Sequence, residues 1–221
     1  MYLLFYLLML IIPTIAQSYV MSTYNKYIKV KAGCNLTGYD MAKKILEKNG
    51  LGSLYIVEAQ GTLTDHYDPT RKTVKLSHDV FHGDSISSIA IAAHECGHAI
   101  QDKEAYSLLR VRSRLVPVVN LATKASYVVI LLGAFMEITD LIFAGILLVG
   151  TGLVFQLVTL PVEIDASRRA LVQMEECGVL SGDTDGVRVM LKAAALTYVA
   201  AVITSAIEVL RLLLVFGRRR D

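Results

Sequence analysis

The stretch His94-Glu95-Cys96-Gly97-His98 decides how the rest of this chain is interpreted. On an α-helix, residues four apart lie about 40° from each other around the axis and about 6 Å apart along it. His94 and His98 therefore share one helix face, and their imidazoles can bind one Zn²⁺ at about 2.0–2.1 Å each. Glu95 is placed to take a proton from a water molecule at the metal. The pattern is typical of zinc hydrolases, most of which are peptidases.

The residues around this stretch predict an amphipathic helix. The histidines share a face with Ser87, Ile91 and Gln101, and the expected N-cap is Asp84 or Ser85. Two histidines packed on an ordinary helix are the alternative, but the uninterrupted helical pattern favours metal binding. A buried stripe is expected at Ile86, Ile89, Ala90, Ala93, Gly97 and Ile100.

Composition points to a membrane protein rather than a nucleic-acid-binding protein. The 221 residues are 54% hydrophobic, with a net charge of only +2 and a mean hydropathy of +0.50. The cysteines Cys34, Cys96 and Cys177 are odd in number and lack metal-binding spacing, so no disulfide framework is expected. Cys96 lies about 200° from His94 around the helix, and we expect it to pack rather than to bind metal.

The first 25 residues carry no charge, and residues 2–20 are long enough to cross a bilayer. A cleavable signal peptide is the alternative, because Ala16-Gln17-Ser18 offers small residues. No lysine or arginine precedes the apolar run, however, which favours a retained anchor.

Two further apolar runs, residues 115–136 and 141–162, predict a transmembrane hairpin with Glu137 and Asp140 at its tip. Basic residues lie just before and just after the hairpin and directly after the anchor, which places these ends in the cytoplasm. They are Arg110, Arg112 and Arg114 before the hairpin, Arg168 and Arg169 after it, and Lys26, Lys29 and Lys31 after the anchor.

The last apolar stretch, residues 193–216, is ambiguous because Glu208 and Arg211 lie within it. Basic residues flank it on both sides: Arg188, Lys192, Arg218, Arg219 and Arg220. This stretch either crosses the membrane as a fourth spanning helix or packs on the domain and the membrane surface, and the sequence leaves both alternatives open.

Residues 26–109 contain most of the water-exposed part. Thr37 and Asp40 resemble a capping box, and Gly50 is expected to end the helix that follows. Residues 54–57 and 73–76 predict strands, with a third beginning at Leu63. An edge strand beside the metal can hold an extended substrate, although an ordinary hairpin is the alternative.

A catalytic zinc needs a third protein ligand. Glu163 and Asp165 are the candidates, and about 200° separates them on a helix. One can face the metal while the other orients a histidine through its free ring nitrogen. The alternative is that both pair with Arg168 and Arg169.

Three histidines remain outside this pattern. His66 is a candidate to stabilise an oxyanion, and His82 is a rival third ligand because it lies close to the metal helix. His78 is expected to make an ordinary surface or turn contact.

Together these residues resemble the YugP-like family of bacterial membrane zinc peptidases. More distantly, the chain is similar to HtpX-like proteases and type I CAAX prenyl proteases. The likeness covers nearly the whole chain and is carried by residues 63–69, 75–77, 85–101, 161–170 and 193–201.

The resemblance implies that His94, His98 and Glu163 bind zinc and that Glu95 is the catalytic base. It also implies an active site facing the cytoplasm and a role in membrane-protein turnover. Those relatives usually carry Asp four residues after the ligand glutamate, where this chain has Ser167. We expect Asp165 to take over the orienting role.

The expected fold class is α+β: a mainly helical, membrane-anchored zincin of gluzincin-like type with a small antiparallel sheet. The predicted divisions are an anchor (1–21), the first zincin part (22–114), a transmembrane hairpin (115–162) and a third-ligand part with the last helix (163–221). The predicted function is a zinc endopeptidase of the plasma membrane, with one Zn²⁺ per chain and membrane proteins as substrates. A non-proteolytic zinc-binding scaffold is the alternative.

Overall fold

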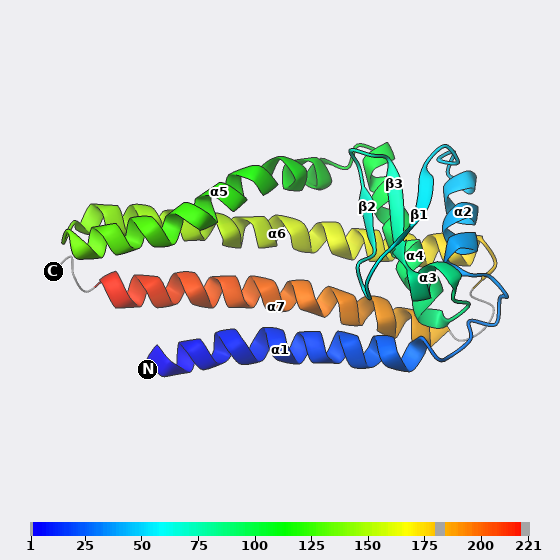
Figure 1. The fold of residues 1–221 in the computed structure, drawn as a ribbon, viewed down its shortest axis with the longest axis horizontal. Helices are drawn as coiled ribbons and strands as arrows, with labels where there is room; N and C mark the ends of the chain where they lie inside the picture. Colours follow the sequence, from blue (N-terminus) through cyan, green and yellow to red (C-terminus); the bar gives the residue numbers. More distant parts are fainter. Residues whose placement is uncertain (1, 180–183, 218–221) are drawn as a thin grey trace. The chain divides into compact units, whose positions relative to one another are not determined.

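The computed structural model describes residues 2–179 and 184–217. The predicted arginine tail, Arg218 to Arg220, lies outside the described residues. Figure 1 follows the elements in chain order: α1 (Tyr2–Tyr27), α2 (Gly38–Lys48), β1 (Tyr55–Ala59), β2 (His66–Asp68), β3 (Thr73–Ser77), α3 (His78–His82), α4 (Ile86–Lys103), α5 (Ser107–Phe135), α6 (Thr139–Glu176) and α7 (Thr184–Phe216).

Two compact units divide the chain. The helical unit comprises Met1–Gln17, Ser107–Pro161 and Thr197–Asp221, and the mixed unit comprises Ser18–Tyr106 and Val162–Leu196. The helices α1, α6 and α7 each contribute residues to both units. The described residues form mainly helices and one three-stranded sheet, which confirms the expected mainly helical chain with a small sheet.

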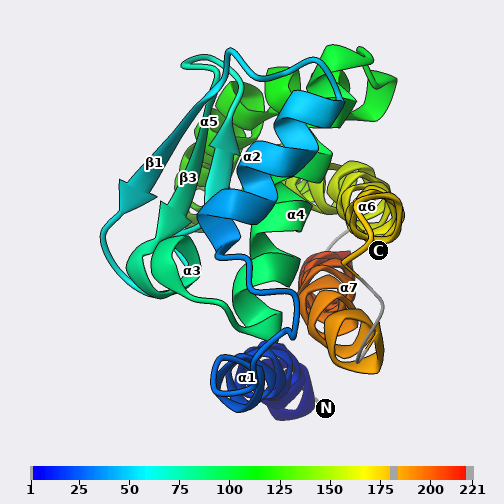
Figure 2. The same cartoon turned by 90° about the vertical axis from the view of Figure 1, so that its right-hand side faces the viewer.

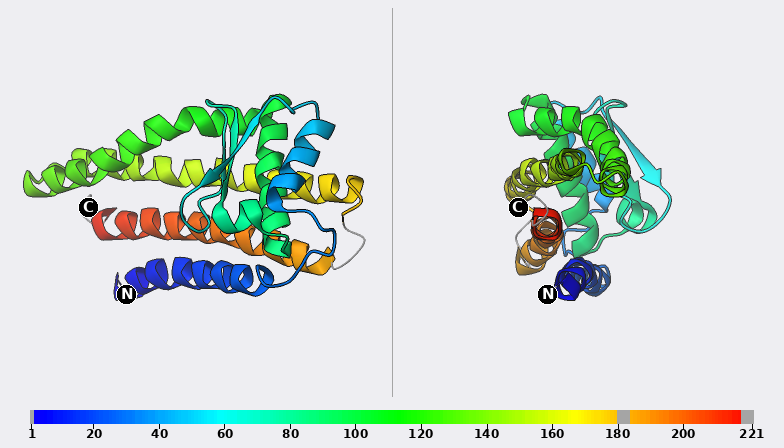
Figure 3. Two further views of the ribbon diagram at one scale, coloured as in Figure 1. Left: turned by 45° about the vertical axis from the view of Figure 1, so that its right-hand side comes forward. Right: turned by 90° about the vertical axis from the view of Figure 1, so that its left-hand side faces the viewer.

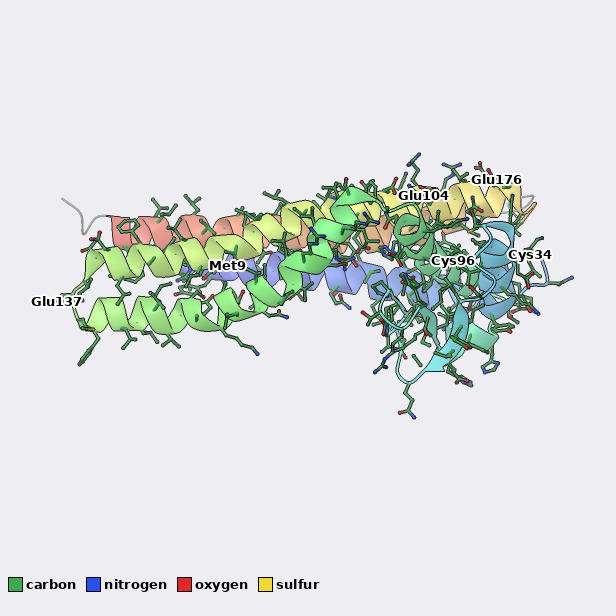
Figure 4. All side chains as sticks on the ribbon, turned by 90° about the horizontal axis from the view of Figure 1, so that it is seen from above. Met9, Cys34, Cys96, Glu104, Glu137 and Glu176 are labelled. Carbon is green, nitrogen blue, oxygen red and sulfur yellow. The ribbon has the colours of Figure 1, made fainter. Side chains whose placement is uncertain are left out.

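Four of the described helices are long and apolar enough to cross a membrane, namely α1, α5, α6 and α7. Helices α5 and α6 form a hairpin, and Glu137 lies in the turn between them (Figure 4). Close approach of the two helices requires glycine, because a Cβ at Gly145 would lie 2.5 Å from Ile130 Cγ1 and 3.0 Å from Ser126 O. Ile130, Ile142, Ile146 and Leu212 form a small core in this unit.

The two charges in the last helix pair with each other. Arg211 Nη2 donates to Glu208 Oε1 at 2.6 Å, and Arg211 Nη1 donates to Tyr6 Oη of α1 at 2.7 Å. Tyr127 Oη of α5 donates to the same glutamate at 3.1 Å. Charged side chains within apolar helices are tolerated when they are paired in this way.

The sheet of the mixed unit has the order β1-β3-β2 and is mixed, not antiparallel as the sequence predicted. Strands β2 and β3 pair antiparallel, whereas β1 pairs parallel with β3. The cause is the connection after β1, which passes the end of β3, where Ser77 N donates to Asp65 Oδ1 at 2.7 Å. Strand β2 begins at His66 rather than at Leu63, whose positive φ of 55° is incompatible with a strand.

The helix α2 forms as the sequence predicts. Thr37 and Asp40 make the capping box, and Gly50 follows the helix end with a φ of 65°. Helix α2 packs against α4 (Figure 2), and it buries Met41, Ile45 and Leu46. The short helix α3 between β3 and α4 was not predicted.

Helix α4 is enclosed by elements from most of the mixed unit (Figure 3). Its expected stripe is buried at all six positions. Cys96 is fully buried and packs as expected, with its Sγ 3.7 Å from Ala42 O. The enclosing core includes Tyr24 of α1, Val74 and Leu76 of β3, Met174 of α6 and Met190 of α7. Because this packing fixes α4, it also fixes the positions from which the two histidines project.

Candidate metal centre

The site is built from α4 and the part of α6 that follows its apolar run. Ser85 is the N-cap of α4, and its hydroxyl accepts from Ser88 N at 3.1 Å. Asp84, the other N-cap candidate, instead forms an ion pair with Lys31 at 2.8 Å. Helix α6 continues without interruption to Glu176, so Glu163 lies directly after the apolar run, one residue beyond Val162.

Glu163 faces both histidines. Its Oε2 lies 3.3 Å from His94 Nε2 and 3.4 Å from His98 Nε2. The two imidazoles meet edge to face, with ring centroids 4.8 Å apart. All three side chains are largely buried, with exposed fractions of 13% for His94, 10% for His98 and 2% for Glu163.

These distances fit a zinc ion. Two ligands that each lie about 2.0–2.1 Å from a tetrahedral zinc are separated by about 3.3–3.4 Å. Two imidazoles and one carboxylate are also a known ligand set of catalytic zinc, which leaves a fourth position for water or substrate. The donor types and their spacing therefore both suit the ion that the sequence pattern predicts.

Gly97 allows α4 and α6 to approach closely enough for this arrangement. A Cβ at Gly97 would lie 2.5 Å from Ala166 O and 3.1 Å from Ala166 C, both backbone atoms that cannot rotate away. The glycine between the two histidines therefore brings the Glu163 turn of α6 within reach of both rings.

Gln101 fixes the tautomer of His98. The amide Nε2 of Gln101 donates to Val162 O at 2.8 Å and to Asp165 Oδ2 at 2.9 Å. Its Oε1 therefore faces His98 Nδ1 at 3.0 Å and can only accept a hydrogen bond. The proton of His98 must then be on Nδ1, which leaves the Nε2 lone pair directed toward Glu163 and available to a metal.

The other histidine is held by Ser167, whose Oγ lies 3.2 Å from His94 Nδ1. A hydroxyl thus lies beside the ring nitrogen of His94 that is turned away from Glu163. Asp165 reaches His98 only through Gln101, and it also forms ion pairs at 2.6 Å with Arg168 and with Arg169. The predicted pairing with the two arginines therefore holds for Asp165, while Glu163 faces the histidines.

Glu95 is buried and held by the neighbouring edge strand. Its Oε2 accepts a hydrogen bond from Tyr67 N of β2 at 2.9 Å. Tyr67 Oη also donates to Asp102 Oδ2 at 2.8 Å, which ties β2 to the next turns of the same α4 face. Burial raises the pKa of Glu95 to about 7, and the nearby Glu163 adds to the rise while His94 opposes it.

The remaining histidines lie elsewhere. His66 is exposed on β2, and its Nδ1 lies 2.8 Å from Thr64 O. His82, the rival third ligand, contacts Glu58 and not the α4 histidines. The roles of Gln101, Ser167 and Tyr67 were not inferred from the sequence. Two of them carried a signal: Gln101 lies three residues after His98 on the same helix face, and Ser167 lies four residues after Glu163, a position that the resemblance had singled out.

The geometry agrees with comparisons to known proteins. The sequence model of a family described as "Putative neutral zinc metallopeptidase" matches residues 2–217. A Bacillus subtilis (strain 168) protein described as "Putative membrane protease YugP" is 44% identical over 207 residues, which cover 93% of this chain and 92% of that protein. No solved structure matches the chain.

Proposed function

This chain belongs to the family described as "Putative neutral zinc metallopeptidase", and from that premise we propose that it is a zinc endopeptidase that cleaves membrane proteins at the cytoplasmic face of the plasma membrane. The observation that carries this proposal is the donor spacing in the buried trio, His94, His98 and Glu163. Glu163 Oε2 lies 3.3 Å and 3.4 Å from the two Nε2 atoms, as a tetrahedral zinc requires.

The buried trio would hold one zinc ion. When bound, zinc polarises the scissile carbonyl and makes a water molecule a stronger nucleophile. Gln101 and Ser167 hold the rings of the two histidines through their Nδ1 atoms. Asp165 supports this arrangement by fixing the Gln101 amide.

Glu95 is the proposed general base. One carboxylate oxygen, Oε2, is held by Tyr67 N–H, and the other can take the proton from the attacking water and pass it to the leaving amine. His66, on β2 next to Tyr67, stays our candidate to stabilise the developing oxyanion.

The proposed substrate follows from the place of the site along the chain. Glu163 directly follows the apolar run of α6, so the zinc would lie near the membrane surface. Basic residues follow the apolar run of α1 and lie before and after the hairpin in the sequence, which favours the cytoplasmic side for these ends. Strand β2 lies at a sheet edge beside Glu95, and an extended segment of a membrane protein could pair with it.

Paired charges also favour a fourth crossing by α7. Glu208 and Arg211 satisfy each other at 2.6 Å, with Tyr6 and Tyr127 completing their hydrogen bonds. Such a pair removes the main obstacle to burying this helix in lipid.

The proposal is tested with Glu95→Gln in the full chain, reconstituted with a single-span model membrane protein and assayed in parallel on β-casein. Loss of a general base should lower the cleavage rate by about 10²–10⁴-fold while zinc content is unchanged. Glu47→Gln is the matched control, because it makes the same change at an exposed position of α2.

Cleavage by Glu95→Gln at the wild-type rate would contradict the assigned mechanism. A wild-type chain that holds zinc but cleaves neither substrate would favour the non-proteolytic scaffold.

A further inference from the structure

A second cluster of metal-binding side chains lies on the surface of the mixed unit. It consists of Glu58 of β1 with His78 and His82 of α3, and we refer to it as the exposed trio. His78 Nδ1 lies 2.6 Å from Glu58 Oε1, and His82 Nε2 lies 3.1 Å from Glu58 Oε2. Among the described residues, the buried trio and the exposed trio are the two groups of three donors within 4.8 Å of one another.

Strand register brings these residues together. Helix α3 begins at His78, directly after Ser77 ends β3. In the parallel pairing of β1 with β3, Glu58 lies opposite Leu76, two residues before His78. The carboxylate therefore reaches the start of α3 from the neighbouring strand, and the two imidazoles lie one helical turn apart with centroids 4.9 Å from each other.

The backbone that carries the two histidines is tightly held. Val80, between them, is fully buried. A Cβ at Gly38 would lie 2.1 Å from Val80 O, so α2 approaches α3 closely. A Cβ at Gly83, the C-cap of α3, would lie 2.3 Å from Asp79 O, so the chain also turns tightly at the end of this helix. The His82 ring also contacts Phe81, with centroids 4.8 Å apart. The donors therefore project from a rigid base even though they are exposed.

The donor chemistry selects the class of ligand. Imidazole nitrogens suit zinc and its neighbours among the transition metals, whereas Ca²⁺ and Mg²⁺ prefer oxygen ligands only. Exposed fractions of 70% for the His78 side chain, 55% for His82 and 44% for Glu58 leave room for an ion and for water.

We propose that Glu58, His78 and His82 bind a second divalent transition-metal ion, such as zinc, which links edge strand β1 to α3. This site is separate from the buried trio and does not depend on the proposed peptidase activity. The ion closes a link between two elements that are 20 residues apart in sequence at Glu58 and His78, so binding stabilises the mixed unit.

The experiment compares zinc content and thermal unfolding of the full chain, purified in detergent without a polyhistidine tag, stripped of metal and titrated with ZnCl₂. We expect about two zinc ions per wild-type chain, and about one in His78→Asn/His82→Asn and in His94→Asn/His98→Asn. Glu47→Gln, at an exposed position of α2 outside both trios, is the control and should match the wild type in zinc content and unfolding temperature.

Unfolding separates a lost ion from a misfolded chain. His78→Asn/His82→Asn should unfold at the wild-type temperature without metal, since both side chains are exposed. Zinc should raise the unfolding temperature of His94→Asn/His98→Asn but not of the variant that lacks all four histidines. The same zinc content in wild type and in His78→Asn/His82→Asn would overturn the proposal, as would a folded His94→Asn/His98→Asn that binds no zinc.

Discussion

The buried trio and the exposed trio contain the same donors in the same local arrangement. Each combines two histidines four residues apart on one helix with a glutamate from another element. The ring centroids are 4.8 Å apart in the buried pair and 4.9 Å apart in the exposed pair. Helical spacing alone therefore accounts for the pairing of the imidazoles in both places.

The two trios differ in how the carboxylate is held. In the buried trio it lies 3.3 Å and 3.4 Å from the two nitrogens, whereas in the exposed trio the distances are 2.6 Å and 3.1 Å. Packing of α6 against Gly97 fixes Glu163 at the spacing of metal ligands. The Glu58 side chain is free to close onto its histidines as hydrogen-bond partners. The two trios have the same donor residue types. Burial and backbone packing therefore decide in which trio the ligands are already in place before metal binds.

Removing the carboxylate is expected to have the largest effect and to differ most between the trios. Glu163→Gln should lower zinc affinity and cleavage by at least about 100-fold, because even residues that only contact a ligand change affinity by about 10–100-fold. Glu58→Gln should remove only the more weakly held ion. Zinc titration and cleavage assays measure both effects. Wild-type zinc affinity in Glu163→Gln would show that the buried trio is not the metal centre.

Breaking the hydrogen bonds that Gln101 makes with His98 and Val162 tests whether these bonds orient the His98 ring. Gln101→Leu leaves His98 Nδ1 and Val162 O without their buried partner. We expect zinc affinity to fall by about 10–100-fold. Gln101→Glu is the informative companion, since it keeps an acceptor for His98 but repels Val162 O and Asp165. An unchanged zinc affinity in Gln101→Leu would mean that α4 packing alone orients the ring.

Gly97→Ala tests the close approach of the helices. The added methyl group would meet Ala166 O, so we expect a loss of about 1–3 kcal/mol in the free energy of unfolding and weaker zinc binding. Gly150→Ala is the matched control, because its Cβ would meet no atom within 4 Å in the interior of α6. Chemical denaturation and zinc titration of both variants measure the difference. Equal behaviour of the two would remove the role assigned to Gly97.

Ser167 gives the smallest expected effect. Ser167→Ala removes one hydrogen bond to His94 and should lower zinc affinity by about tenfold or less. Ser167→Asp should bind zinc at least as tightly as wild type, because a carboxylate accepts from His94 Nδ1–H more strongly than a hydroxyl. Weaker zinc binding in Ser167→Asp than in Ser167→Ala would contradict this account.

Local patterns predicted much of the helical structure. The capping box at Thr37, the N-cap at Ser85 and the buried stripe of α4 are all present, because each depends on residues within a few positions of one another. The sheet was predicted less well. Two of its strands were placed to within about two residues, but the parallel pairing of β1 depends on the path of the chain past Ser77.

By itself, the sequence determined which side chains of α4 share a face and which two carboxylates could approach them, since helical periodicity is a property of neighbouring residues. The family resemblance named Glu163 as the ligand, but only the tertiary structure decided the contacts, in which Glu163 faces the histidines while Asp165 turns to Arg168 and Arg169. It also assigned positions to Gln101 and Ser167 and gathered Glu58 with His78 and His82. The contacts of Glu163, Ser167 and Glu58 join residues far apart in the chain, and their distances are set by how closely two backbones pack.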